Sequence, residues 1–332
     1  MKRRDFITVL GGLAASSWSR SAKLQISGTS ATNGPLVGFL NAASPATYRF
    51  NADAFRQGLA EAGFVEGRNV RIEERWANGD YQRLATLAAE LVSKGVVAIA
   101  ATGDVVSARA AKQASATVPV VFTIGGDPVR YGLVSSFNRP GANITGITFV
   151  STVLGAKRVQ LLHDLAPKSR RIALLMNPDN ANAAAEQSDA QAGAKKLGHE
   201  TLVVEARNAD EIDAAFARLT GNADAVIAAT DPVMLDRREQ IVALANRHGL
   251  PAVSFTRPFA LAGGLMSYGP DIGWMYRQAG GYVGQILKGA KPAEMPVMQS
   301  TRFELVLNLR AARRLGLAVS PAFLASVDEV IE

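Results

Sequence analysis

The chain has 332 residues, a formal net charge of +7 and no cysteine. This length suits two domains better than one, and the lack of cysteine excludes disulfides, iron–sulfur clusters, thiol nucleophiles and Cys-ligated zinc. Four basic residues stand against Asp5 in the first 22 positions, so the remaining chain is only mildly basic, at about +4. Its arginine clusters are scattered and lack interleaved aromatics, which favours solvated surface over nucleic-acid binding.

Residues 1–34 have the pattern of an export signal followed by a linker. A basic head leads into a short apolar segment that ends near Ala15 and then into Ser/Arg-rich sequence. The pair Arg3-Arg4, followed by Asp5-Phe6-Ile7, is typical of the twin-arginine type. The apolar segment is too short to span a bilayer well. The pattern predicts an exported, periplasmic protein whose mature start lies between Ala22 and Pro35, without a lipoprotein anchor.

From Pro35 the sequence alternates short β-branched runs with amphipathic segments, which predicts a first lobe over residues 35–146. Gly63 and Gly95 stand where a helix C-cap glycine belongs. Strands that alternate with helices indicate a mostly parallel, doubly wound sheet. The predicted strands are Leu36–Leu40, Val70–Glu74, Val96–Ala101, Val118–Ile124 and Ile144–Phe149, and the helices are Asn51–Ala62, Tyr81–Ser93 and Val105–Ala114.

Two loops follow the fourth strand run. Gly125-Gly126-Asp127-Pro128 turns the backbone tightly and stops a helix from starting before Val129. We interpret it as one wall of a binding cleft. The second loop, Asn138–Asn143, is predicted to cross from one lobe to the other.

Residues 147–268 repeat this pattern and predict a second lobe. Three local matches, at offsets of 136, 128 and 132 residues and in the same order, indicate a duplication. They pair Asn41 with Asn177, Thr102 with Thr230, and Pro119 with Pro251. The predicted strands are Ile172–Met176, Glu200–Glu205, Ala225–Ala229, Ala252–Phe255 and Gly264–Tyr268, and the helices are Ala183–Leu197, Glu211–Leu219 and Met234–Arg247.

Residues 269–332 do not form a third lobe. Ile272–Leu287 predicts one more helix, Arg302–Asn308 a strand, and Asn308 the cap of a short helix that ends at Gly316. This segment is predicted to return to the first lobe and to complete a multi-stranded hinge.

Ligands of open α/β sheets bind beyond the carboxyl ends of the strands. That rule selects the polar and glycine positions after each predicted strand. Asn41, Asn177 and Thr102 have an equal alternative, since such residues also cap helices. Asp231 is favoured as a ligand contact, because a carboxylate there suits a ligand ammonium. The predicted ligand-binding residues are Asn41, Ser44, Thr102, Gly103, Gly126, Asp127, Asn177, Asp231 and Tyr268.

The sequence contains no strong catalytic or cofactor pattern. The histidines at 163, 199 and 248 lie far apart in the pattern, and neither a P-loop, a dinucleotide glycine motif nor G-x-S-x-G occurs. We therefore expect no catalytic residue, no metal and no cofactor. Aromatics near the strand ends, at Tyr48, Phe122, Phe255 and Tyr268, suit an apolar or aromatic ligand, although core packing accounts for the two phenylalanines equally well.

Several longer segments carry a resemblance to a known family. They are MKRRDFI, GGDPVRYGLVSSFNRPGANITG, RREQIVALANRHGLPAV, AGGLMSYGPDI, YVGQILKGAKPAEMPV and FELVLNLRAARRLGL. Together they resemble the ABC transporter substrate-binding proteins of the TrpX-like family over nearly the whole chain after Pro35. The resemblance implies a periplasmic binding protein of type I, with two Rossmann-like lobes that close on a small solute. It also implies an ABC permease and its ATPase as partners, a monomer, and an amino acid or aromatic amino-acid-like compound as the solute.

Two other functions fit the same features less well. Twin-arginine export also serves cofactor-loaded enzymes, and an absorbance spectrum with a bound chromophore would favour that class. A ligand-sensing domain that contacts a receptor has the same fold. Genes for a permease and an ATPase beside this one would decide against it.

Overall fold

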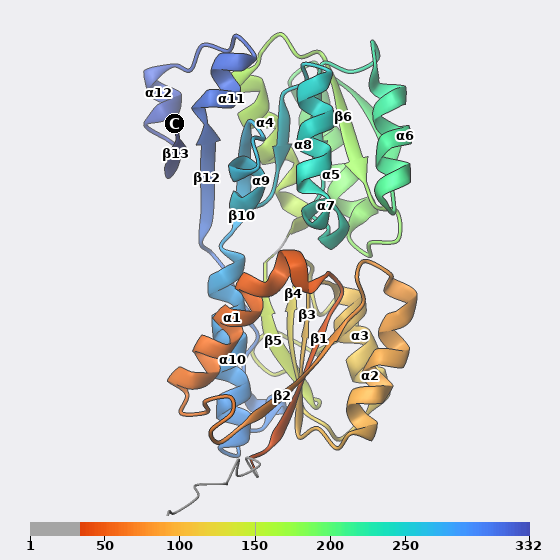
Figure 1. Ribbon diagram of the computed structural model, residues 1–332, viewed down its shortest axis with the longest axis vertical. Coiled ribbons are helices and arrows are strands. Elements are labelled where there is room, and N and C mark those ends of the chain that lie inside the picture. The colour runs from red at the N-terminus through yellow and green to blue at the C-terminus, as the bar shows by residue number, and fades with distance from the viewer. Residues whose placement is uncertain (1–33, 150) are drawn as a thin grey trace, which may run out of the picture. The chain divides into compact units, whose positions relative to one another are not determined.

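The computed structural model describes residues 34–149 and 151–332. The predicted signal and linker, residues 1–34, fall almost wholly outside the described residues. Within the described ranges the strands form one sheet of six strands and one of seven, each flanked by helices (Figure 1). The prediction of an α/β fold with two doubly wound lobes is confirmed.

Among the described residues, no helix is both long enough and apolar enough to cross a membrane.

The first sheet has the strand order β11-β5-β4-β3-β1-β2, and its paired strands are parallel. β3, β4 and β5 are buried along their whole length, as expected for parallel strands covered by helices on both faces. The strands are β1 (Leu36–Asn41), β2 (Arg71–Trp76), β3 (Ala98–Thr102), β4 (Val120–Ile124), β5 (Ile144–Thr148) and β11 (Met298–Gln299). The helices of this lobe are α1 (Pro45–Glu61), α2 (Leu84–Ser93), α3 (Val105–Ala114) and α10 (Ile272–Leu287), with 3-10 turns η1 (Tyr81–Arg83) and η3 (Pro292–Glu294).

The second sheet has the order β13-β12-β10-β9-β8-β6-β7, in which β10 and β12 are antiparallel and the other pairs are parallel. Its strands are β6 (Arg171–Met176), β7 (Glu200–Glu205), β8 (Ala225–Ala228), β9 (Ala252–Ser254), β10 (Met266–Pro270), β12 (Phe303–Asn308) and β13 (Glu329–Ile331). Its helices are α4 (Gly155–Leu165), α5 (Ala183–Lys196), α6 (Ala209–Leu219), α7 (Pro232–Asp236), α8 (Arg238–Arg247), α9 (Arg257–Leu261), α11 (Leu309–Arg314) and α12 (Pro321–Leu324), preceded by the turn η2 (Ser151–Val153).

The chain passes between the two sheets three times, after β5, after β10 and after β11. The loop Asn138–Asn143 joins β4 to β5 within the first sheet, so the prediction that it crosses between lobes is wrong. The predicted limit between residues 146 and 147 falls inside β5, and the segment 269–332 is shared between the sheets. The exact limits of the lobes stay a prediction.

Two predicted helix boundaries are corrected by capping chemistry. α1 begins at Pro45 rather than at Asn51, because Ser44 has the extended backbone of an N-cap and proline suits the first helical position. The single helix predicted over Met234–Arg247 is two helices that break at Arg237, whose φ of −99° and ψ of 14° are not helical. The short elements α9, α12 and β13 were not predicted, because three to five residues carry too little periodicity.

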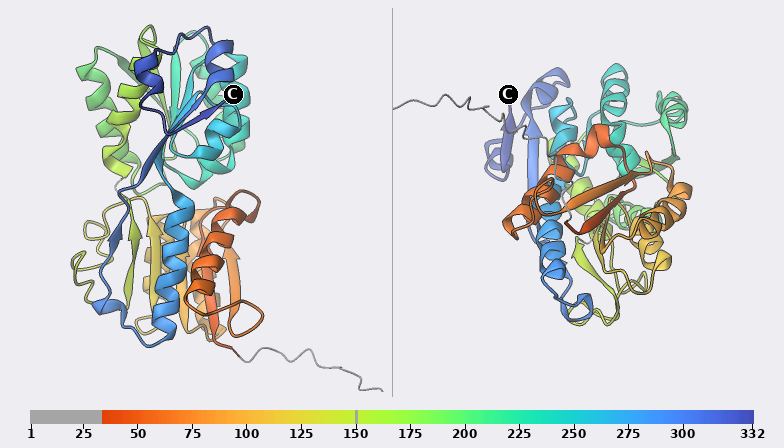
Figure 2. Two further views of the ribbon diagram at one scale, coloured as in Figure 1. Left: turned by 90° about the vertical axis from the view of Figure 1, so that its left-hand side faces the viewer. Right: turned by 60° about the horizontal axis from the view of Figure 1, so that its bottom comes forward.

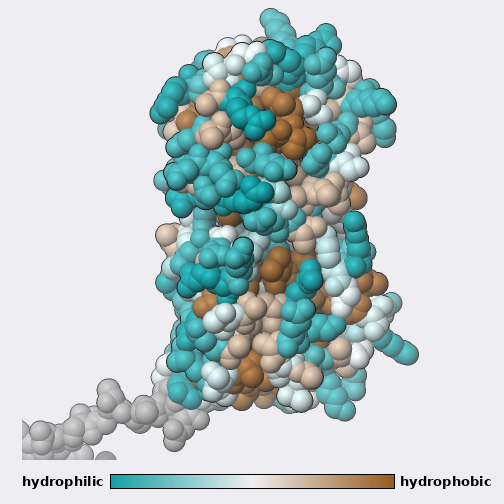
Figure 3. Space-filling model, turned by 90° about the vertical axis from the view of Figure 1, so that its right-hand side faces the viewer, coloured by the Kyte–Doolittle hydropathy of each residue, from teal (hydrophilic) through white to brown (hydrophobic). Residues whose placement is uncertain are grey.

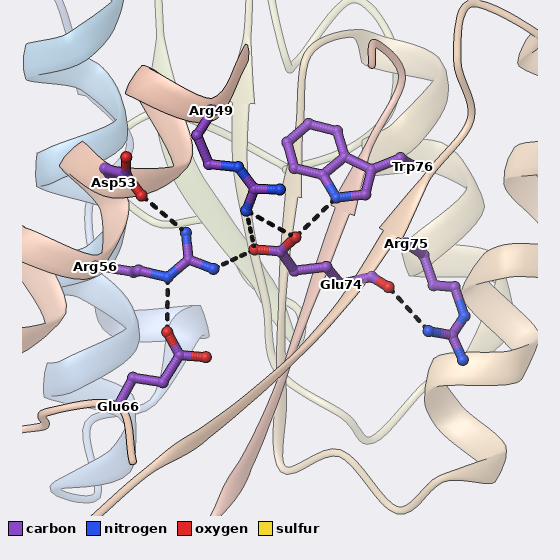
Figure 4. A network of polar contacts seen from close by, with 7 residues as sticks. All are labelled: Arg49, Asp53, Arg56, Glu66, Glu74, Arg75 and Trp76. Atoms are coloured by element: carbon purple, nitrogen blue, oxygen red, sulfur yellow. Dashed lines mark hydrogen bonds and ion pairs between the residues drawn. The ribbon is translucent and has the colours of Figure 1, made fainter. Parts of the chain in front are cut away.

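A network of charges joins α1 to β2, the edge strand of the first sheet (Figure 4). The Glu74 carboxylate on β2 pairs with Arg56 from α1 and accepts a hydrogen bond from Trp76 Nε1 at 2.9 Å. Arg56 Nε also donates to Glu66 at 2.6 Å. Charged side chains along an edge strand oppose pairing with another chain, so the network protects this edge while it positions α1.

α10 returns to the first lobe and packs against α1 (Figure 2). The contact depends on glycines: a Cβ atom at Gly58 would overlap the carbonyl oxygen of Arg277, and one at Gly280 would overlap the carbonyl oxygen of Phe55. The two backbones therefore approach closely. The helix that follows the second lobe in sequence thus becomes part of the core of the first.

This contact predicts opposite effects at two adjacent glycines of α10. Gly280→Ala inserts a methyl group against Phe55 and should lower the free energy of unfolding by about 1–3 kcal/mol. Gly281→Ala is the matched control, because nothing lies within 4 Å of a Cβ there, and alanine should add up to about 1 kcal/mol through helix propensity. Urea unfolding followed by circular dichroism measures both. Equal effects at the two positions would contradict the close packing of α1 and α10.

Candidate functional site

The loops that leave the carboxyl edges of the two sheets line one shared cavity. Gly103 and Asp104 follow β3, Gly125 follows β4, and Thr230 and Asp231 follow β8. This is the position at which parallel α/β sheets bind ligands. The lining residues are Tyr48, Gly103, Asp104, Thr123, Ile124, Gly125, Phe149, Asn182, Thr230, Asp231, Pro232, Phe255, Ile272 and Tyr276.

The cavity has a volume of about 30 Å³. A cavity of roughly 150 Å³ holds one benzene molecule. An amino-acid-sized ligand therefore enters only if the two lobes, or the side chains between them, move apart.

The wall from the first sheet combines a strained turn with a free hydroxyl. Gly103 has φ +92°, a conformation that favours glycine, and a Cβ there would lie 3.0 Å from Asn41 Oδ1. Asp104 then caps α3 by accepting a hydrogen bond from the Val106 amide at 2.9 Å. The Thr123 hydroxyl is buried and has no hydrogen-bond partner among the described residues. It is therefore available to a ligand.

Four aromatic rings contribute the apolar part of the lining, from α1, from the segment after β5, from the segment after β9, and from α10. All four side chains are buried. The rings of Tyr48 and Tyr276 lie with their centroids 6.3 Å apart and their planes at 48°, in a tilted arrangement that suits aromatic contacts. The other two rings are those of Phe149 and Phe255.

Asn41 and Thr102, two predicted site residues, form a buried network that orients one of these rings. Asn41 Nδ2 donates to Thr102 Oγ1 at 2.8 Å and to the Tyr276 hydroxyl at 3.0 Å. Thr102 Oγ1 donates in turn to the carbonyl oxygen of Leu40 at 3.1 Å. Burial raises the pKa of Tyr276, so its hydroxyl stays neutral. Asn41 and Thr102 thus support the wall on which Tyr276 stands.

Asp231, the predicted ammonium partner, lines the cavity and is hydrogen-bonded at both oxygens. Oδ1 accepts from the amides of Val233 at 2.7 Å and Met234 at 3.4 Å, which caps α7. Oδ2 accepts from the Tyr81 hydroxyl at 2.8 Å and from Asn177 Nδ2 at 3.2 Å. Burial raises the pKa of Asp231, while its donors oppose that shift. The side chain is therefore both a helix cap and a buried acceptor at the cavity.

Asp104 is the second carboxyl group of the cavity, and its environment favours the protonated form. Burial raises the pKa of Asp104 to about 7, and the nearby negative charge of Asp231 adds to the shift. Since the two carboxyl groups come from different lobes, the cavity brings together two acidic groups that would repel each other when both are ionised.

A buried ion pair supports the second-lobe wall. Arg158 on α4 donates from Nη1 to Glu186 Oε1 at 2.6 Å, and the two side chains are 0% and 4% exposed. Glu186 also accepts hydrogen bonds from the Thr230 amide and hydroxyl, both at 3.0 Å. The loop that carries Thr230 and Asp231 is thereby fixed to α5 and α4.

Three of the predicted site residues lie beside the cavity and do not line it. Ser44 donates its hydroxyl hydrogen to Asp236 Oδ1 at 3.2 Å. Gly126 accepts a hydrogen bond from Thr148 Oγ1 at its carbonyl oxygen, at 2.6 Å. Asp127 accepts from the Val129 amide at 2.9 Å and shapes its own turn. Its loop still contributes to the cavity through Gly125.

Two further predicted residues lie near the second sheet. Asn177 contacts Asp231 but faces a larger outer pocket of about 590 Å³. Tyr268 stacks on Phe303, with ring centroids 6.1 Å apart, and its carbonyl oxygen accepts from Arg158 Nε at 2.9 Å. The structure therefore brings Asn41, Thr102, Gly103 and Asp231 to the cavity or its wall and places the others around it.

Several cavity residues were not predicted. Asp104 and Thr123 stand at strand ends, so the rule that selected Thr102 and Gly126 could have included them. Phe149 follows β5, whose exit carries no predicted site residue. Tyr276 could not be found this way, because it lies inside a helix that returns to the first lobe from far along the sequence.

The outer pocket lies next to the cavity, and most of its lining residues are polar or charged. It is lined by loops of both lobes, among them Asn78–Gln82 after β2 and Arg207 after β7. Tyr81 and Asn177 line it and also hydrogen-bond Asp231, so these two side chains separate the pocket from the cavity. Figure 3 views the molecule from the side of α2 and α6, where hydrophilic surface separates the hydrophobic patches.

No group of three or more histidine, aspartate or glutamate side chains suited to a metal ion occurs within residues 34–149 and 151–332.

Comparison with known proteins identifies the family. The family model described as "ABC transporter substrate binding protein" matches residues 43–331. This chain belongs to that family.

Individual relatives of this substrate-binding protein carry ligand names. A tyrosine-binding protein from Clostridioides difficile is 26% identical over 254 residues, which cover 76% of this chain and 73% of the relative. The structure of an ABC domain in complex with L-Trp from Streptococcus pneumonia is 25% identical, with a TM-score of 0.82 over 90% of this chain and 100% of the other.

A solute-binding protein of a 5-methylthioribose transporter from Thermotoga lettingae shares the fold at 15% identity, with a TM-score of 0.58 over 88% of this chain and 95% of that one. Chains with this fold therefore bind chemically unlike solutes.

The buried ion pair behind the cavity predicts a large loss of stability when one partner is removed. Glu186→Ala leaves the Arg158 guanidinium buried without its carboxylate and should lower the free energy of unfolding by about 3–5 kcal/mol. Glu294→Ala is the control, because the Lys291–Glu294 side chains are 75% and 72% exposed and such pairs contribute about 0–1 kcal/mol. Chemical unfolding of both variants is the measurement. Similar losses would contradict the buried role of Glu186.

Proposed function

We propose that this substrate-binding protein captures an aromatic amino acid, or a closely related aromatic amine, in the cavity between its lobes. The observation that carries the proposal is the composition of the lining, in which four aromatic side chains and two carboxyl groups line the same cavity. Aromatic side chains bury a large apolar area and pack well against a ring of the solute. Carboxylates provide strong, charge-assisted hydrogen bonds to an ammonium group.

Asp231 and Asp104 are the groups we assign to the ammonium. No lysine, arginine or histidine hydrogen-bonds either carboxyl group within the described part of the chain. A cationic solute would therefore supply the positive charge that these two acidic groups lack. The aromatic ring of the solute would then lie among Tyr48, Phe149, Phe255 and Tyr276.

The polar end of the solute opposite the ammonium is assigned to Thr123 and to the backbone at Gly103. Thr123 has a buried hydroxyl without a partner among described residues, so a ligand oxygen there would satisfy it. Asn41 and Thr102, for which direct contact was predicted, already hydrogen-bond each other and Tyr276. Their proposed role is to hold this wall in place.

Binding would couple to movement of the lobes. A solute held by one lobe gains contacts with the other only when they close, so its differential affinity shifts an open–closed equilibrium. The small cavity volume supports this, because the solute must enter before the walls meet. The outer pocket beside Tyr81 and Asn177 is the proposed entrance.

The family supports a role in transport, and the remaining assignments follow from it as proposals. The basic, twin-arginine-type start of the sequence supports export to the periplasm. There the closed, loaded protein would act as a monomer, without a cofactor and without catalysis, and deliver the solute to an ABC permease driven by its ATPase. The relatives named for tyrosine and bound to L-Trp support an aromatic amino acid as the solute.

The ammonium assignment predicts the result of a binding experiment with L-tryptophan and L-tyrosine. After unfolding and refolding to remove carried-over solute, a ligand at 100 times its dissociation constant should add about 2.7 kcal/mol of stability. Asp231→Asn keeps a good helix cap but loses the charge, and should raise the dissociation constant by about one to two orders of magnitude. Asp127→Asn, outside the cavity, is the control.

Two outcomes would contradict the proposal. Unchanged affinity in Asp231→Asn would show that this carboxylate does not bind the ammonium. No binding of any amino acid, together with a bound chromophore or turnover, would favour an exported enzyme instead.

The free hydroxyl of Thr123 gives an independent test of the polar contact. Thr123→Val removes an unpartnered buried hydroxyl, so the unliganded protein should be as stable or more stable, while affinity should fall about tenfold. Thr256→Val is matched to it, since Thr256 also has a buried hydroxyl without a partner among described residues but does not line the cavity. Calorimetric titration of both variants makes the comparison. Equal affinities in the two would contradict the assignment of Thr123.

A further inference from the structure

One side-chain amide lies between the carboxyl groups of the two lobes. Asn180, in the loop after β6, donates from Nδ2 to Asp104 Oδ2 of the first lobe at 2.9 Å. The same nitrogen donates to Asp231 Oδ2 of its own lobe at 2.8 Å. Its Oδ1 accepts from the Asn182 amide at 2.8 Å, which fixes its orientation. All three side chains are buried.

The chain of contacts crosses between the lobes twice. Tyr81, from the first lobe, donates to the same Asp231 oxygen at 2.8 Å. The order of contacts is therefore Tyr81, Asp231, Asn180 and Asp104, with the outer two residues in the first lobe and the inner two in the second. The Tyr81–Asp231 and Asn180–Asp104 contacts join residues of different lobes, so they exist only while the lobes are together.

The two carboxyl groups are unequal in their hydrogen bonds. Asp231 accepts from five donors, and such donors stabilise a carboxylate. Asp104 accepts from the Val106 amide and from Asn180. A proton taken up by the pair therefore resides on Asp104, in agreement with the raised pKa of about 7 at this residue.

The other ionisable groups nearby do not neutralise Asp104. Three tyrosines lie near Asp104: Tyr48 on α1, Tyr81 on η1 and Tyr131 after β4. Burial raises the pKa of each phenol, so their hydroxyl groups stay neutral. Asp236 on α7 adds another acidic group near Tyr48. The Arg158 and Glu186 charges behind Thr230 compensate each other within the second lobe.

We propose that Asn180 and a proton on Asp104 together form a latch between the lobes, so that closing takes up one proton when no cationic solute is bound. The proposal rests on the closing motion of the proposed function and adds its regulation. A solute ammonium would take the place of the proton. The carboxyl pair would then let the lobes close for either a cationic ligand or a proton.

The direction of the pH effect follows from the sign of the shift. When the lobes separate, water reaches Asp104 and its pKa returns toward the ordinary value near 4. Closing of the lobes is therefore favoured at low pH. The contribution of the Asp104 proton to closing is lost as pH rises through about 7. One proton changes the closing equilibrium constant by about tenfold per pH unit between about pH 5 and 7.

The natural absence of cysteine gives a direct measurement of closing. Cysteines introduced at the exposed positions Arg109 on α3 and Asp210 on α6 carry a donor and an acceptor dye, one on each lobe. Energy transfer is measured without solute from pH 5 to pH 8. The expected result is a closed fraction that decreases with rising pH, with a pH dependence that corresponds to uptake of one proton on closing. A flat profile overturns the proposal.

Three variants identify the group responsible. Asp104→Asn keeps the cap of α3 and should remove the pH dependence above about pH 6, where the raised pKa of Asp236 no longer contributes. Asn180→Asp keeps the acceptor for the Asn182 amide but adds a third carboxylate. The closed fraction of this variant should therefore be smaller at pH 8 and should depend more steeply on pH. Asp236→Asn is the control, since burial raises the pKa of this second interlobe carboxyl group to about 6. The latch is overturned if the pH dependence of the closed fraction is lost in Asp236→Asn but kept in Asp104→Asn. It is also overturned if Asn180→Asp has the same pH dependence as the natural protein.

The result separates the latch from the proposed function. Circular dichroism at pH 5 and pH 8 checks that each variant is folded. A pH-dependent closed fraction in a protein that binds no aromatic amino acid would support the latch and contradict the proposed solute. Binding of L-tryptophan by a protein whose closing is independent of pH would support the solute and overturn the latch.

Discussion

Polar groups at the ends of buried strands must find hydrogen-bond partners away from water, and this requirement organises both lobes. In the first lobe Asn41 and Thr102 satisfy each other and hold Tyr276. In the second, Glu186 accepts from Thr230 and is balanced by Arg158. Each sheet edge is thus a rigid, preorganised surface. The groups that meet across the gap are Tyr81 and Asp104 of the first lobe and Asp231 and Asn180 of the second.

Much of the fold could be predicted, because strand and helix periodicity is a local property. The alternation of buried runs located β1, β3, β4 and β6 to within a few residues, and the helix 272–287 has the limits expected from its sequence. Strand ends also pointed to Asn41, Thr102 and Asp231. These side chains do lie at the cavity or its wall, because parallel strands bring their carboxyl ends to one edge.

The rest depends on tertiary contacts that no local pattern records. Tyr276 reaches the cavity only because α10 crosses back onto α1 through glycine contacts. Asn180 acquires its importance from Asp104, which lies in the other lobe. Tyr268 follows the strand-end rule, yet its ring turns toward Phe303, because β12 pairs with β10 from the end of the chain. Local sequence patterns place these residues on helices, strands and loops, but their partners are set only by the folded chain.

The three crossings between the sheets set the mechanics of the molecule. They leave from β5 and β11, which are neighbours in the first sheet, and they involve β10 and β12, which are neighbours in the second. β2 and β7 lie at the opposite ends of their sheets. A rotation about the crossings therefore has its longest lever arm at those edge strands. The loops after β2 and β7 carry Asp80 and Arg207, so charged side chains lie where such a rotation would move the two sheets furthest apart.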